Sequence, residues 1–359
     1  VCEKVILKIY NLSPITENKK SVLLTEINPN EYEYLISELS KKGVQILILN
    51  NRKPAIWDKN SLRIIRKYNC KILGLEELLS KEDKRNILEF SEQIKQKIRL
   101  LRNYNEEIRH SFLFDGISFW DCIEKKLLEI FESRCEWYIL LINGVAKIIQ
   151  NYNIKSIISF NVIGETEKAV LGINDNIIPS IMLVHAFDNY SAESARYDIL
   201  SMYSLFNDKI AVWGDVQKEY LQKAHGIDNE RIILSGSPRH DKFFRDKEMK
   251  NKQKKIILIT PRPIIETAIH KKVELYKKYE IILKQIINHL QNFKEFEIVI
   301  KIHPGLDLHS LEIKKIIKKI NSNIPIYQNI SIQKLFERSW AHVNISPEGF
   351  DISTVLMES

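Results

Sequence analysis

The sequence has few cysteines and no long apolar run. Its four cysteines are scattered along 359 residues with no CxxC pair, so the pattern favours neither a zinc site nor a disulfide framework. No stretch approaches the roughly 18 apolar residues of a membrane helix, and the N-terminus lacks the charged-then-apolar order of a signal peptide. We therefore expect a cytoplasmic protein in a reducing compartment.

The sequence also lacks a large excess of one charge. Its 54 basic and 46 acidic side chains leave a formal net charge of +8, which argues weakly for an anionic partner such as a phosphorylated small molecule or a membrane surface. Nucleic acid is not singled out, and we expect none as a partner. Much of the lysine falls on predicted solvated helix faces, as at Lys314-Lys315, so a solubilising surface is the simpler explanation.

Length and one polar stretch predict two domains. A chain of 359 residues exceeds the size at which a single core usually keeps growing, and residues 241–255 are too polar to bury a core. We predict an N-terminal domain over residues 1–245 and a C-terminal domain over residues 246–359. The chain starts without Met and stops soon after a predicted helix start, so we expect both ends to belong to a longer protein and the second domain to be truncated.

Strands and helices alternate in both halves. Residues 21–25 and 44–49 are predicted strands on either side of a helix that Gly43 closes, which is a βαβ pattern. Further strands are predicted at residues 156–160, 178–184, 208–213, 231–235, 255–260, 296–300 and 341–345. The fold class is therefore α/β, with two Rossmann-type doubly wound domains.

A helical insertion interrupts the first domain. Residues from about 75 to 150 are charged, poor in Gly and Pro and almost entirely helical in pattern, so they predict a helical arm. An aromatic-rich turn around Gly116 divides this arm. The arm has a simpler explanation as amphipathic packing helices. The aromatic side chains suit either a sugar-stacking surface or a plug in the core where the chain reverses.

The motif Lys301-Ile-His-Pro-Gly305 follows the buried strand at residues 296–300, so His303 leaves the sheet at the edge where ligands of parallel sheets collect. Pro304 and Gly305 hold it on a stiff turn, which suits a group that meets a phosphate or sugar oxygen. Taken alone, His303 has a simpler explanation as a strand cap.

Two further loops are predicted to reach the same edge as His303. Arg262 follows the strand at residues 255–260, and Ser353-Thr354 stand at a helix start, where free amides and a partial positive charge suit phosphate. Ser353 alone is more simply an N-cap. Together these groups predict a diphosphate site for a donor, made of Arg262, His303, Pro304, Gly305, Ser353 and Thr354.

The first domain presents acidic residues and a histidine after its strands. Glu165 is the candidate general base for an acceptor hydroxyl, and His185 is the candidate to position the acceptor or neutralise its phosphate. Asp188 and Glu167 are further acceptor-side candidates. Both glutamates fall in the predicted exit loop of the strand at residues 156–160, which runs over residues 161–167, so a solvated loop charge is the simpler alternative for each.

Several runs of the sequence resemble a known family. Val212-Trp-Gly214, Gly226-Ile227 and Arg231-Ile-Ile-Leu-Ser-Gly-Ser-Pro-Arg239 resemble the end of the first domain of GT-B glycosyltransferases. Lys301-Ile-His-Pro-Gly305 and Ser353-Thr354, with Glu358, resemble their nucleotide-binding elements. The similarity is closest to bacterial capsule and surface-polysaccharide enzymes, including polysialyltransferase-like and CDP-glycerol glycerophosphotransferase-like proteins. It covers residues 156–359 and leaves out the helical arm.

The resemblance implies a GT-B-like fold, in which the two doubly wound domains face a cleft, and it also implies a function. It makes Glu358 a contact to the donor's ribose or sugar and implies no metal and no cofactor, with a nucleotide-sugar as substrate. We expect a glycosyltransferase that moves the sugar to a cell-surface polysaccharide or glycolipid acceptor, with peripheral contact to an anionic membrane at its inner face. The alternatives are a CDP-polyol phosphotransferase, a non-catalytic nucleotide-binding protein and a sugar-nucleotide epimerase. Ser-Pro-Glu-Gly in place of the epimerases' Gly-Gly pair disfavours the last.

Overall fold

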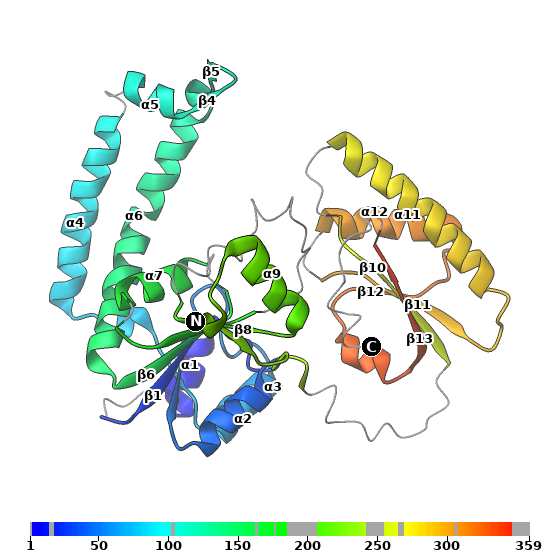
Figure 1. Cartoon of the computed structure of the whole chain (residues 1–359), viewed down its shortest axis with the longest axis horizontal. Coiled ribbons are helices and arrows are strands. Elements are labelled where there is room, and N and C mark those ends of the chain that lie inside the picture. The colour runs from blue at the N-terminus through cyan, green and yellow to red at the C-terminus, as the bar shows by residue number, and fades with distance from the viewer. Residues whose placement is uncertain are drawn as a thin grey trace. The chain divides into compact units, whose positions relative to one another are not determined.

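The computed structural model describes residues 2–13, 18–101, 105–161, 164–175, 177–184, 207–241, 255–264, 269–304 and 307–346 (Figure 1). The chain divides into two compact units, and the described strands β1 to β9 belong to the first and β10 to β13 to the second. The predicted domain boundary at residues 245–246 lies outside the described residues.

The first unit is built on a seven-stranded sheet in the order β3-β2-β1-β6-β7-β8-β9, and every neighbouring pair is parallel. The sheet order reverses beside β1, because β2 and β3 follow on one side and β6 to β9 on the other. In open α/β sheets such a reversal is where ligands bind. The strands are β1 (Ser21–Thr25), β2 (Gln45–Leu49), β3 (Lys71–Ile72), β6 (Ile154–Ser159), β7 (Ser180–Leu183), β8 (Lys209–Val212) and β9 (Ile232–Leu234).

Local sequence explains where the helices of the first unit stop and start. Gly43 and Gly226 follow α2 and α9 with φ of 71° and 62°, left-handed values that favour glycine, and the sequence predicts the first of these helix ends. Asp58 caps α3 by accepting a hydrogen bond from the Ser61 amide at 2.7 Å. The helices are α1 (Cys2–Ile9), α2 (Glu33–Lys41), α3 (Lys59–Lys67), α7 (Glu165–Asn174) and α9 (Asp215–His225), with short 3-10 turns at Leu75–Glu77 and Asn229–Arg231.

The predicted helical arm consists of a helix pair with a small hairpin at its end (Figure 1). Its helices α4 and α6 share a small core that includes Ile87 and Ile139. Trp120 is 2% exposed and lies 5.0 Å from the Phe112 ring, which supports a core plug at the aromatic turn. Its elements are α4 (Lys81–Leu100), α5 (Asn105–Ser111), β4 (Leu113–Phe114), β5 (Ile117–Ser118) and α6 (Trp120–Asn151).

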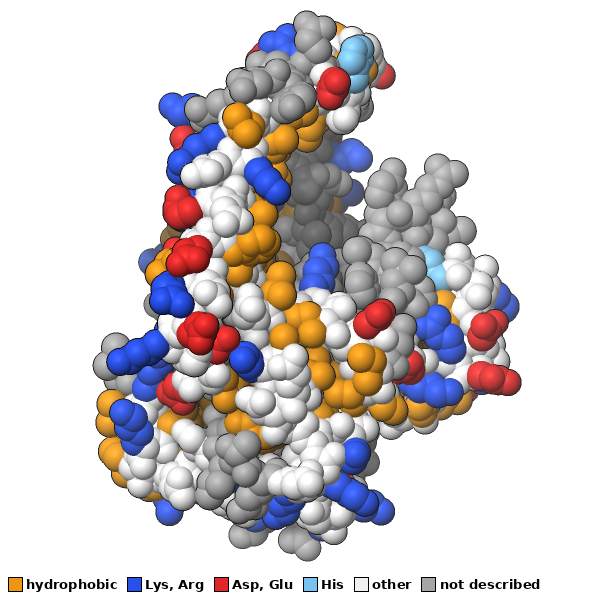
Figure 2. Space-filling view, turned by 90° about the vertical axis from the view of Figure 1, so that its left-hand side faces the viewer, with side chains coloured by type: hydrophobic (Ala, Val, Ile, Leu, Met, Phe, Trp, Pro, Cys, Tyr) orange, Lys and Arg blue, Asp and Glu red, His pale blue; other side chains and the backbone are white. Residues whose placement is uncertain are grey.

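Apolar side chains also remain on the outside of the arm. Leu88, Phe90 and Phe131 are about half exposed, and Figure 2 shows apolar side chains between charged ones along the arm. Even so, none of the helices in the described ranges is both long enough and apolar enough to span a bilayer.

The second unit is a four-stranded parallel sheet in the order β12-β11-β10-β13, with helices on both faces. Ile259 and Ile300 pack toward α11 and α12, whereas Leu258 and Val299 pack toward α13. This alternation follows from the two-residue period of a strand. It confirms the predicted α/β class. The elements are β10 (Ile256–Pro261), α11 (Ile269–Leu290), β11 (Glu297–Lys301), α12 (Asp307–Ile320), β12 (Ile326–Tyr327), α13 (Ile332–Phe336) and β13 (Ser339–Ile345).

Candidate functional site

The switch point of the first sheet, between β1 and β6, carries a cluster of acidic residues. Glu26 directly follows β1, and the first turn of α7, after β6, contains Glu165 and Glu167. The sequence predicted a loop up to residue 167, but α7 begins at Glu165 after the N-cap Gly164. Acidic side chains stabilise the positive end of a helix, which explains the earlier start.

Glu165, the predicted general base, is held by side chains from α6. Arg134 Nη2 lies 2.5 and 2.6 Å from its two carboxylate oxygens, and the Tyr138 hydroxyl donates to it at 2.8 Å. Burial raises the pKa of Glu165, but the Tyr138 hydrogen bond and the Arg134 charge outweigh it, so the pKa is lowered overall. A carboxylate stabilised in this way is a weak proton acceptor. The role of Glu165 as the general base stays a prediction, whereas this geometry favours a carboxylate that remains ionised.

Glu167 lies in a different environment although it is only two residues away. Its side chain is fully buried, and one carboxylate oxygen is 2.5 Å from Arg52 Nη2. Burial raises its pKa to about 7, although the Arg52 charge acts against this. The alternative of a solvated loop charge is therefore wrong for Glu167, because the start of α7 turns this side chain inward.

Gly164 lies directly against the ion pair of Glu167 and Arg52. A Cβ atom on Gly164 would lie 2.8 Å from the Glu167 carboxyl carbon and 2.9 Å from Arg52 Cζ, closer than such atoms approach. A larger residue at position 164 would therefore force the Glu167 carboxyl or the Arg52 guanidinium to move, so glycine suits this position for space rather than for its backbone angles.

Glu26 and Arg52 were missed by the sequence analysis. Glu26 has a left-handed φ of 52°, unusual for a non-glycine residue, and one of its carboxylate oxygens accepts hydrogen bonds from the Thr166 hydroxyl at 2.6 Å and the Asn51 amide at 2.8 Å. It therefore connects the ends of β1, β2 and β6. The sequence did contain a signal for both residues, which is their position. Glu26 directly follows one predicted strand, and Asn50-Asn51-Arg52 follow the next.

Arg262 leaves the second sheet directly after its central strand β10. Its amide donates to the Ile345 carbonyl at 2.8 Å, which joins the exits of β10 and β13. The buried Tyr279 of α11 donates to the carbonyls of both Arg262 and Ile345 and so fixes this turn. Because β10 pairs in parallel with both β11 and β13, Arg262 and His303 leave neighbouring strands at one edge, as predicted.

His303 is exposed at the end of β11, next to Pro304. The neighbouring Lys301 is buried, and its ammonium donates to the Gln328 carbonyl at 2.8 Å. Surrounding atoms and the Lys301 charge lower the pKa of His303 below its usual 6.5. His303 is therefore mainly neutral at pH 7 and can form hydrogen bonds through its imidazole, and the nearby positive charge is that of Lys301.

A polar network inside the same sheet was not predicted. The Thr260 hydroxyl shares a hydrogen bond of 2.7 Å with His342 Nε2, and Asn344 donates to the same hydroxyl at 2.9 Å. Burial lowers the pKa of His342 to about 4, so it stays neutral. This network holds the ends of β10 and β13 together, just before Arg262.

Six predicted site residues fall outside the described residues, so their placement is not part of this geometry. They are His185, Asp188, Gly305, Ser353, Thr354 and Glu358. Among the described residues, no group of three or more His, Cys, Asp or Glu side chains is arranged to hold a metal ion.

The two parallel Rossmann-type α/β units are those of a GT-B fold. The structure of UDP-GlcNAc 2-epimerase from Neisseria meningitidis bound to UDP-GlcNAc matches with a TM-score of 0.52 at 13% identity, over 91% of this chain and 78% of that one. UDP-GlcNAc 2-epimerase from Methanocaldococcus jannaschii matches with a TM-score of 0.49 at 10% identity, over 91% and 79%. The wall teichoic acid polymerase TagF matches with 0.41 at 11%, over 99% and 74%.

The family itself follows from the sequence. The family described as CDP-Glycerol:Poly(glycerophosphate) glycerophosphotransferase matches residues 78–334, and the chain belongs to this family. It is therefore a transferase, and the predicted resemblance is confirmed. The match extends through the helical arm, which the resemblance drawn from sequence motifs did not cover. No curated protein sequence matches the chain significantly.

Proposed function

We propose that the protein transfers a polyol phosphate from a CDP-linked donor to a hydroxyl group of a surface-polymer acceptor. Family membership is the observation that carries this proposal. It supports transfer of a polyol phosphate, an alternative in the sequence analysis, over transfer of a sugar. Arg262 and His303 at one sheet edge support it, because a diphosphate offers acceptors for both.

In the proposed reaction the acceptor oxygen forms a bond to the β-phosphorus of the donor. The bond from that phosphorus to the bridging oxygen breaks, and CMP leaves with the electron pair. The positive charges of Arg262 and of Lys301, which lies two residues before His303, offset the negative charge that builds up on the leaving nucleotide. Ser353, Thr354 and Glu358 remain proposed donor contacts on the sequence resemblance alone.

The acceptor proton needs a base. Because Glu165 is stabilised in its ionised form by Arg134 and Tyr138, it is poorly suited to take a proton. We favour His185, the other predicted catalytic residue, since histidine is the side chain that most often acts as a general base. Asp188 stays an acceptor-side candidate. The net charge of +8 suits a polyanionic or lipid-linked acceptor at an anionic membrane face.

Transfer of a sugar from a nucleotide-sugar donor is the second candidate, because that donor presents the same diphosphate to Arg262 and His303. Mass spectrometry of products from CDP-glycerol and from CDP-, UDP- and GDP-sugars separates the two. We expect a phosphodiester and CMP. A glycoside with a nucleoside diphosphate would favour sugar transfer, an isomerised nucleotide-sugar would indicate an epimerase, and no product from any donor would contradict a transferase role.

A donor-binding variant tests the second sheet edge. His303→Ala is expected to lower transfer about 100-fold, the usual loss when one donor to a charged transition state is removed, and to reduce the rise in melting temperature that CDP-glycerol produces. His289→Ala is the matched control, since His289 is an exposed histidine at the end of α11 in the same unit. Equal transfer by both variants would contradict the assignment of His303.

A further inference from the structure

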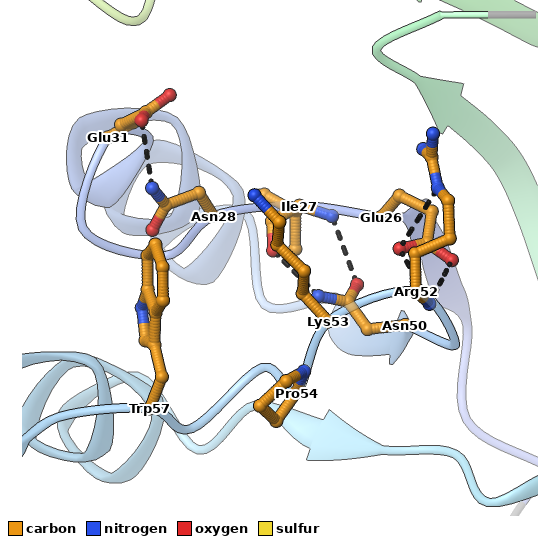
Figure 3. Close-up of a pocket in the computed structure, with 9 residues that line it drawn as sticks. All are labelled: Glu26, Ile27, Asn28, Glu31, Asn50, Arg52, Lys53, Pro54 and Trp57. Carbon is orange, nitrogen blue, oxygen red and sulfur yellow. Dashed lines mark hydrogen bonds and ion pairs between the residues drawn. The ribbon is translucent and has the colours of Figure 1, made fainter. Parts of the chain in front are cut away.

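The first unit contains a pocket that no predicted site residue lines. It has a volume of about 310 Å³ and lies at the carboxyl ends of β1 and β2 (Figure 3). Its lining includes Glu26 and Arg52, so it adjoins the acidic cluster at the switch point. The volume is near the lower end of the roughly 300–1,000 Å³ of small-molecule sites, which suits a unit of a few carbons with one phosphate.

Most polar groups that line this pocket already form hydrogen bonds or ion pairs with other groups of the protein. Asn50 donates to the Ile27 carbonyl at 2.8 Å and accepts from its amide at 3.0 Å. Asn28 donates to Glu31 at 2.8 Å, and the Arg52 guanidinium pairs with two carboxylates. The walls are therefore rigid before any ligand arrives, which lowers the entropic cost of binding.

Two side chains that line the pocket remain available to contact a ligand. Among the charged lining residues in the described part of the chain, Lys53 is the one with no ion pair or hydrogen bond to another residue. Trp57 is 52% exposed, although a ring of this size is usually much more buried. Figure 3 shows Trp57 and Arg52 at opposite ends of the pocket with Lys53 between them.

We propose that this pocket binds a phosphorylated polyol or sugar unit of the acceptor chain, with the phosphate on Lys53 and the carbon backbone against the Trp57 ring. An exposed ammonium selects the phosphate, and an indole face packs against C–H groups. The inference rests on the proposed function, because it treats the ligand as part of the acceptor. It predicts an acceptor subsite in the first unit, whereas the donor-binding residues belong to the second.

Binding is tested without turnover. In protein labelled with 5-fluorotryptophan, the Trp57 resonance is the one missing from Trp57→Phe. We expect it to shift with glycerol 3-phosphate and more with a glycerol phosphate oligomer, and to shift little with glycerol or inorganic phosphate. The shift should weaken in Lys53→Gln and persist in Lys42→Gln, an exposed lysine of the same unit. If glycerol shifts the Trp57 resonance as much as glycerol 3-phosphate does, the assignment of the phosphate to Lys53 is wrong. If none of these ligands shifts the resonance, the pocket is not their binding site.

Kinetics test the link to the acceptor. Trp57→Ala should raise the KM for the acceptor about tenfold, since an aromatic contact and its buried area are lost, and Lys53→Gln about threefold, because exposed charge pairs are weak. The KM for the donor should not change, and Trp340→Ala, exposed in the second unit, should change neither. An unchanged acceptor KM in both pocket variants would overturn the inference. If the wild type shows no transfer, the proposed function is wrong instead. The fluorine titration then tests binding in the pocket by itself.

A lipid headgroup presents the same chemistry as the acceptor. Phosphatidylglycerol vesicles are therefore titrated beside the soluble oligomer. A shift of the Trp57 resonance with the oligomer supports an acceptor subsite, whereas a shift with vesicles alone would overturn it.

Discussion

Replacing Glu167 with Gln should change how the stability of the first unit depends on pH. Burial raises the folded-state pKa of Glu167 from 4.5 to about 7. Between these values the folded protein keeps a proton that the unfolded chain has released, so the free energy of unfolding falls as pH rises. The shift corresponds to about 3 kcal/mol of stability, which is fully present below pH 4.5 and is lost by pH 8.

Glutamine keeps an oxygen for Arg52 and has no proton to lose. Glu167→Gln should therefore stabilise the first unit by about 2–3 kcal/mol at pH 8 and change it little at pH 5. Four of the five tryptophans lie in the first unit and only Trp340 lies in the second. In a Trp340→Phe background, tryptophan fluorescence during urea unfolding therefore reports the first unit alone.

Glu165→Gln is the matched control, with the opposite sign. Because the folded-state pKa of Glu165 is lowered, its stabilisation is present above pH 4.5 and lost as pH falls through the folded value. That variant should be less stable than wild type at pH 7 and equal to it at strongly acidic pH. If Glu167→Gln and wild type lose stability in parallel from pH 5 to pH 8, Glu167 is not the group that titrates.

Three further predictions follow from the same contacts. Gly164→Ala should destabilise the first unit by about 1–3 kcal/mol through overpacking against Glu167 and Arg52, measured by the same urea unfolding, and an unchanged midpoint would contradict the closeness of this contact. His185→Gln should lower kcat much more than Glu165→Gln in steady-state assays, and the reverse order would restore Glu165 as the base. We also propose that transfer needs neither metal nor cofactor, so dialysis against EDTA should leave the rate unchanged, and recovery on adding Mg²⁺ would refute this.

Much of the fold was readable from the sequence. Strands buried on both faces, such as β1 and β2, appear as continuous apolar runs, and Gly43 marks the end of α2 through its left-handed backbone. The start of α7 was misjudged because a glycine N-cap gives little signal in the sequence. Helix α1 was not predicted, although its Leu7 is buried in the first core.

The candidate site was only partly readable, because its key contacts join distant segments. Thr166 bonds to Glu26 across 140 residues, and no local pattern indicates that β1 pairs with β6. The opposite protonation of Glu165 and Glu167 also depends on which side of α7 each faces. By contrast, Arg262 and His303 were predictable together, because ends of neighbouring parallel strands share one edge.

The balance of charge at the switch point bears on the proposed acceptor. Three carboxyl groups, on Glu26, Glu165 and Glu167, would repel a polyanionic chain if all were ionised and unpaired. Arg134 pairs with the first-turn Glu165, Arg52 lies against Glu26 and Glu167, and Glu167 keeps its proton below about pH 7. Two arginines and one proton thus balance these three carboxyls, so the switch point adds no net negative charge to that of Glu31, which lines the same pocket as Lys53. As pH rises and Glu167 ionises, this balance is lost, and the same titration that weakens the first unit should weaken binding of the phosphorylated acceptor.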